Sequence, residues 1–129
     1  MHDDDCSYEQ SWADKFRCAF RGCKLGVRGQ SSFFVHFFMA AAVVVSGFLL
    51  EVSRIEWCLL CLCIAGVLTA EMLNSALESM ARAITHEQNP HVGGALDIGS
   101  ASVLLASIGA AAVGTIIFLN RLAGLMGWW

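Results

Sequence analysis

The sequence of 129 residues is poor in proline and in charge. It contains a single proline, Pro90, and no low-complexity linker, so we expect residues 1–129 to form one domain. Charged residues make up only 15% of the chain, hydrophobic residues make up 57%, and the mean hydropathy is +0.61. A soluble domain of this size would lack the interior to bury so much apolar surface. Composition therefore argues against a soluble protein and favours a membrane protein.

Three long apolar segments lie at about residues 33–50, 55–80 and 97–119. Each is close to the roughly 20 residues that a helix needs to cross a hydrocarbon core of about 30 Å. The segments lack the alternation typical of strands, and in lipid only helices or closed barrels satisfy the backbone. We therefore predict an all-α protein with three transmembrane helices. In the third, small residues recur every four positions and predict close helix packing: Ser102, Ala106, Ala110 and Gly114.

The segment at about residues 12–28 predicts an amphipathic helix lying on the membrane surface. Its apolar side carries Trp12, Phe16 and Phe20, and basic residues fall opposite them. The alternative is a basic flank that only orients the first span. Six basic residues lie in the N-terminal segment and the second loop, against two elsewhere, which predicts a cytoplasmic N-terminus.

Six cysteines do not predict a zinc site. Cys58, Cys61 and Cys63 lie inside an apolar run without the polar groups that a zinc site needs, so we interpret them as small hydrophobic residues. Disulfides are not expected at Cys6, Cys18 or Cys23, because a cytoplasmic segment is reducing.

The stretch AEMLNSALES, residues 70–79, places polar groups at the end of the second apolar segment. Helical geometry puts Glu71, Asn74, Ser75 and Glu78 on one face about 100° wide. An ionised group at membrane depth needs a partner or a function, and two carboxylates two turns apart could divide metal binding from general-base chemistry. The alternative is a helix end with exposed polar residues.

The loop that follows, ITHEQNPHVGGALDIGS, carries further polar residues. Asp97 suits the N-cap or first turn of the third span, and His86 and His91 are interpreted as ordinary loop histidines. His36, inside the first span, is unusual there but could hydrogen-bond near the interface. The sequence has neither GxxxxGK[ST] nor strand–GxGxxG–helix, so a familiar phosphate loop is absent.

AEMLNSALES resembles the signature of the small bacterial integral-membrane lipid kinases, the diacylglycerol/undecaprenol kinase family. KFRCAFRGCK, FFVH, SRIEW and ALDIGSASVLL extend the resemblance over most of the chain. It implies a homotrimer in the bacterial cytoplasmic membrane that transfers the ATP γ-phosphoryl group to a lipid hydroxyl, with Mg²⁺ and without a nucleic-acid partner. The lipid would be diacylglycerol or undecaprenol.

The resemblance also implies roles for particular residues. Glu71 matches the general base that meets the lipid hydroxyl, Asn74 is the signature asparagine beside it, and Glu78 matches a Mg²⁺ ligand. Positions that contact nucleotide correspond to Glu87, Gln88, Asn89, Asp97 and Cys18, and Ser100 corresponds to a position near the lipid.

Several of these positions depart from the family pattern. Gln30 replaces a second metal-binding glutamate, Leu96 replaces a phosphate-binding lysine, and Arg82 stands one turn beyond Glu78, where it could supply the missing cation. Three hypotheses remain open: an active lipid kinase, a relative that binds lipid or a partner without efficient catalysis, and a proton or ion pathway built on Glu71 and Glu78.

Overall fold

A computed structural model describes residues 11–27, 31–84 and 87–128. Four helices make up these ranges, which confirms the all-α prediction. They are α1 (Trp12–Val27), α2 (Ser31–Leu49), α3 (Arg54–Ile84) and α4 (Pro90–Leu125). Three of them, α2, α3 and α4, are long and apolar enough to cross a membrane. Gln30, one of the predicted metal positions, lies outside the described residues.

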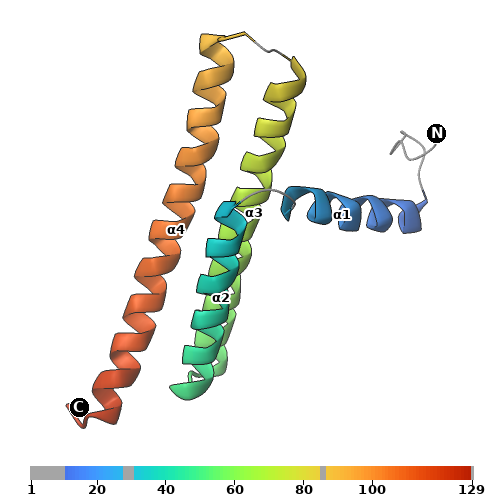
Figure 1. The fold of residues 1–129 in the computed structure, drawn as a ribbon. Coiled ribbons are helices and arrows are strands. Elements are labelled where there is room, and N and C mark those ends of the chain that lie inside the picture. The colour runs from blue at the N-terminus through green and yellow to red at the C-terminus, as the bar shows by residue number, and fades with distance from the viewer. Residues whose placement is uncertain (1–10, 28–30, 85–86, 129) are drawn as a thin grey trace.

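The three apolar helices run alongside one another, and α1 projects from them at a steep angle near the start of α2 (Figure 1). The most extensive contact is between α3 and α4. Both continue well past the start of α2, toward the end of the molecule where they connect (Figure 1). This arrangement leaves one end of the α3–α4 pair uncovered by α2.

Local capping fixes where α3 begins. The Ser53 backbone N–H donates to Glu56 Oε2 at 2.7 Å, and the Glu56 backbone N–H donates to Ser53 Oγ at 3.3 Å. This reciprocal pair is a capping box, in which two backbone donors at a helix start are satisfied by side chains. The SRIE sequence thus starts α3 immediately after the α2–α3 turn.

Helix α4 begins at Pro90, well before the predicted third span. Asn89 is its N-cap, and Asn89 Oδ1 accepts hydrogen bonds from the backbone N–H groups of His91 at 2.9 Å and Val92 at 3.4 Å. Proline suits the first helical position, because its fixed φ is helical and it has no N–H to leave unpaired. The interpretation of Asp97 as an N-cap or first-turn acid was therefore wrong, and Asp97 lies inside α4.

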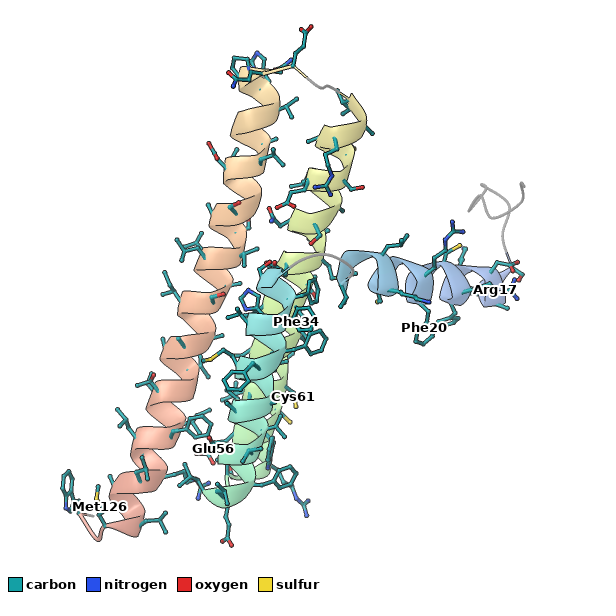
Figure 2. All side chains as sticks on the ribbon, viewed as in Figure 1. Arg17, Phe20, Phe34, Glu56, Cys61 and Met126 are labelled. Atoms are coloured by element: carbon teal, nitrogen blue, oxygen red, sulfur yellow. The ribbon has the colours of Figure 1, made fainter. Side chains whose placement is uncertain are left out.

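The opposite end of the three-helix unit is tied together by tight packing and an ion pair. Val52, Leu60 and Ile117 form a small buried cluster, with Trp57 packed against it. Arg121 of α4 donates from Nε to Glu56 Oε2 of α3 at 3.0 Å. The pair links the two long helices at the end farthest from their connecting loop (Figure 2 labels Glu56).

Most large apolar side chains point outward. Phe34, Phe38 and Phe48 of α2 are each more than 70% exposed, as membrane-facing residues would be. On α1 no residue is buried, and Phe20 extends to the side of α1 on which α2 runs (Figure 2). Phe20 thus points in the direction in which α2 runs, as expected for the apolar side of a surface helix (Figure 2).

One cysteine prediction was wrong. Cys18 of α1 is disulfide-bonded, although its segment was expected to contain only free thiols. That expectation rested on the reducing state of the cytoplasm, which governs whether a disulfide persists. Whether two sulfurs lie close enough to bond depends on the fold instead. The cysteines of the apolar α3 run, Cys58, Cys61 and Cys63, are free.

Candidate active site

Glu71 of α3 is the most deeply buried charged residue in the described part of the chain, with 2% of its surface exposed. Two side chains of α2 meet its carboxylate. Ser32 Oγ donates to Oε1, and His36 Nε2 lies 3.7 Å from Oε2. Close by, the end of α1 packs against α3, because a Cβ atom on Gly26 would fall 2.6 Å from Met72 Sδ. The Glu71 carboxylate is therefore held between α2 and α3, with the end of α1 packed against the neighbouring Met72, as expected for an ionisable group at membrane depth.

Asn74 lies about one turn along α3 from Glu71 and hydrogen-bonds to Glu78. Asn74 Nδ2 donates to Glu78 Oε1 at 3.1 Å, and Asn74 is 8% exposed. On its other side, Asn74 Oδ1 faces the backbone of Gly99 so closely that a Cβ atom there would lie 2.5 Å away. The amide is thus clamped between Glu78 and α4.

Two buried oxygens on this face have no hydrogen-bond partner among the described residues. They are Asn74 Oδ1 and Ser75 Oγ. Buried polar atoms are nearly always paired, so such an acceptor often marks a place where a ligand, ion or water binds. The polar face predicted for AEMLNSALES is therefore buried at Glu71, Asn74 and Ser75, and it is not an exposed helix end.

Glu78 also lines a polar pocket between the end of α3 and the start of α4. The pocket has a volume of about 730 Å³. Its polar lining includes Arg82, Glu87, Gln88 and Asn89. Arg82 is the only lysine or arginine among the described residues that line it. Glu78 therefore connects the buried carboxylate region with a cavity that could admit a polar ligand.

An apolar groove lies on the other side of the site. It has a volume of about 630 Å³ and is bounded by α2, α3 and α4. His36 lines it, and most of its remaining lining is aliphatic, with Met39, Val43 and Leu60 as examples. A hydrocarbon chain matches this lining, whereas a charged ligand does not. Along α3, Glu71 thus lies between the residues that line the apolar groove and Glu78, which lines the polar pocket.

The structure brings some of the predicted site residues together and leaves others apart. Glu71, Asn74 and Glu78 follow one another along α3, and Glu87, Gln88 and Asn89 share the polar pocket with Glu78. Asp97 and Ser100 are exposed on α4 and do not line that pocket, and neither does Cys18 on α1. Leu96 does line it, at the place where the family resemblance implies a lysine.

Sequence reasoning did not include Ser32 and His36 in the site. They are four positions apart on α2, so they share a helix face. The sequence feature that could have indicated their role is a histidine inside an apolar span. What the pattern did not contain was the alignment of α2 with α3, which places both side chains against Glu71.

On this face, Glu78 is the residue whose oxygens could meet a magnesium ion held together with phosphate. The part of the chain that the structure describes contains no group of three His, Cys, Asp or Glu side chains able to hold a metal ion. Mg²⁺ does not need such a cage, because it is commonly held by one or two carboxylates with substrate phosphates and water. The Glu78 carboxylate, which lines the polar pocket, offers an oxygen donor of that kind.

Fold and site together define a multi-pass helical membrane protein with a buried carboxylate beside a polar cavity. The chain belongs to the prokaryotic diacylglycerol kinase family, whose sequence pattern matches residues 17–118. The members of this family are membrane lipid kinases, and a kinase family implies ATP as the phosphoryl donor.

Two named relatives agree with this assignment. An undecaprenol kinase from Bacillus subtilis is 35% identical over 104 residues, which cover 81% of this chain and 85% of the relative. A diacylglycerol kinase from Synechocystis sp. is 35% identical over 113 residues, which cover 86% of this chain and 64% of the relative. The two relatives act on different lipids by name, so similarity alone does not select the acceptor.

Proposed function

We propose that the protein is an ATP-dependent lipid kinase that phosphorylates the hydroxyl group of a membrane lipid, either diacylglycerol or undecaprenol. The observation that carries the proposal is the buried Glu71 carboxylate, held from α2 by Ser32 and His36 and followed along α3 by Asn74 and Glu78. Along α3 it lies between the residues that line a cavity suiting a lipid chain and Glu78, which lines a cavity suiting a polar donor.

In the proposed reaction, Glu71 accepts the proton of the lipid hydroxyl. The hydroxyl oxygen forms a bond to the γ-phosphorus of ATP, the bond from that phosphorus to the β–γ bridging oxygen breaks, and ADP leaves. Phosphoryl transfer depends mainly on positioning and on neutralising charge, and a base near the nucleophile assists it. Mg²⁺ would neutralise phosphate charge, and Glu78 would hold it together with the phosphate oxygens.

Arg82 is the residue we propose to contact the phosphates in the polar pocket. It shares that pocket with Glu78 and Glu87, and a cation is needed where phosphate groups meet two carboxylates. Its position also compensates for the apolar Leu96. Arg82→Ala should raise the KM for ATP about tenfold or more, the usual effect of losing a charge-assisted contact. The exposed Arg54, at the far end of α3, provides the control Arg54→Ala. An unchanged KM for ATP in Arg82→Ala would contradict this role.

The proposal includes an orientation and an assembly. Because ATP is cytoplasmic, the α3–α4 connection and the N-terminus would face the cytoplasm, in agreement with the distribution of basic residues. A homotrimer would cover the end of the small-residue row of α4 that is exposed within one chain, at Ser102.

Purified protein in lipid micelles with γ-labelled ATP and Mg²⁺ tests the function and identifies the acceptor. Diacylglycerol and undecaprenol are supplied in parallel reactions, and label in one lipid above the other names the substrate. Glu71→Ala should abolish the label. Absence of labelled lipid from both acceptors would contradict the proposal and favour a lipid- or partner-binding role.

A proton pathway makes a different prediction, which liposomes can test. Proton flux that Glu71→Gln abolishes, in a protein that labels neither lipid, would show that the buried carboxylate conducts protons and does not activate a hydroxyl.

A further inference from the structure

The two α2 side chains that meet Glu71 are themselves arranged as a unit. Ser32 and His36 lie one helical turn apart and reach different oxygens of the same carboxylate, Oε1 and Oε2. His36 is largely buried, with 18% of its side chain exposed, and Glu71 has 3% exposed. Such a pair is rare at membrane depth unless the two groups serve each other or a ligand.

Among the residues that the structure describes, no other charged group competes for His36. Helix α2 contains no Asp, Glu, Lys or Arg, and the α4 residues that line the adjoining apolar groove are all uncharged. The α3 residues along that groove are apolar as well. Among the described residues, Glu71 is therefore the ionisable partner that faces the imidazole.

The carboxylate keeps capacity for a substrate even with both α2 partners in place. Each carboxylate oxygen has two lone pairs, so one contact to each oxygen leaves room for a hydroxyl. A glutamate side chain has several rotamers, and a base is effective only when it is held close to the proton it removes. Two contacts from one rigid helix face would restrict the carboxylate to a single orientation.

We propose that His36 is a positioning residue for Glu71. Its Nε2–H donates to Oε2 while the Ser32 hydroxyl donates to Oε1, and together they aim the carboxylate at the acceptor hydroxyl. The observed separation of 3.7 Å is within ion-pair distance, and the proposal requires the two atoms to come within hydrogen-bond distance when the substrates are bound. The catalytic consequence rests on the proposed lipid kinase function, whereas the pairing itself does not.

Kinetics of two His36 variants test the positioning role. His36→Leu keeps the volume and removes the donor, and it should lower kcat about tenfold or more while the KM for ATP stays within about twofold. His36→Gln keeps an N–H donor near the Nε2 position and should recover kcat to within about threefold of the wild type. The control His91→Gln alters an exposed histidine of α4 and should match the wild type.

Two kinetic results would contradict the positioning role of His36. Wild-type kcat in His36→Leu, or equal losses in His36→Leu and His36→Gln, would overturn the proposal. Rates are expressed per folded protein, determined from elution as a single species in detergent, so a folding defect is not read as a catalytic one.

Nuclear magnetic resonance tests the pairing without any kinase assay. With ¹⁵N-labelled histidine in micelles, the imidazole signals that disappear in His36→Gln are those of His36. These signals should shift in Glu71→Gln and stay in place in Glu51→Gln, because Glu51 is exposed in the α2–α3 turn. Unshifted signals in Glu71→Gln would overturn the pairing. If the His36 signals shift in Glu71→Gln but the wild-type protein phosphorylates neither lipid, the pairing is upheld and the kinase function is rejected.

Discussion

At Gly99, α4 packs directly against Asn74, and replacing Gly99 tests how tightly the site is built. A Cβ atom at this position would lie 2.5 Å from Asn74 Oδ1 and 3.0 Å from Leu77 Cδ1. Gly99→Ala must therefore move the Asn74 amide or separate α3 from α4. Moving the amide endangers the 3.1 Å hydrogen bond from Asn74 Nδ2 to Glu78 Oε1.

The expected free-energy changes for Gly99→Ala distinguish its effect on the site from its effect on stability. Overpacking costs about 1–3 kcal/mol, and replacing a helical glycine with alanine returns about 1 kcal/mol, so the net loss of stability should be at most about 2 kcal/mol. Loss of a hydrogen bond to a charged group is worth about 1.5–3 kcal/mol, or roughly 10–150-fold in kcat/KM. Activity should therefore suffer more than the fold.

The assay compares Gly99→Ala with Gly109→Ala. Gly109 lies on the same helix, and a Cβ atom there would meet nothing within 4 Å. We expect Gly109→Ala to keep wild-type kcat/KM with stability equal to or above that of the wild type, and Gly99→Ala to lose at least about tenfold in kcat/KM for lipid phosphorylation. Wild-type kcat/KM in Gly99→Ala would refute the claim that α4 clamps Asn74 against Glu78.

Three further predictions concern the ends of the helices. Arg121→Gln should lower the unfolding temperature because it leaves Glu56 without its α4 partner, and adding Glu56→Gln should restore part of the loss. Gly47→Ala should destabilise the protein by about 1–3 kcal/mol in denaturant titration, because its Cβ atom would lie 2.7 Å from the Trp57 ring. Asn89→Ala should remove about 1 kcal/mol and speed amide exchange in the first turn of α4, whereas Asn89→Asp should retain the cap. Unchanged values in any of these variants would contradict the corresponding contact.

The three spans could be predicted from sequence because lipid leaves the backbone few choices. A long apolar run must satisfy its own hydrogen bonds, so composition alone indicates a helix. The polar face of AEMLNSALES was also predictable, since helical geometry follows from residue number. Glu71, Asn74 and Ser75 are buried together as that geometry requires.

Helix ends and contacts between helices were harder to predict. The residues around Pro90, Gly93 and Gly94 looked like a loop, yet the Asn89 side chain caps a helix that runs through them. Ser32 and Glu71 are 39 positions apart, and their contact depends on how α2 is aligned with α3. Local patterns do not contain that alignment, because it results from packing along the full length of both helices.

The most direct test of the central claim is the initial rate of lipid phosphorylation by the wild type, Glu71→Gln and Glu51→Gln in the same micelles. Glu71→Gln keeps the shape of the side chain and removes the base, so its rate should fall about 100-fold or more. Glu51→Gln removes an exposed carboxylate at the other end of the spans and should keep the wild-type rate. A Glu71→Gln variant that phosphorylates lipid as fast as the wild type would contradict the assignment of Glu71 as the base.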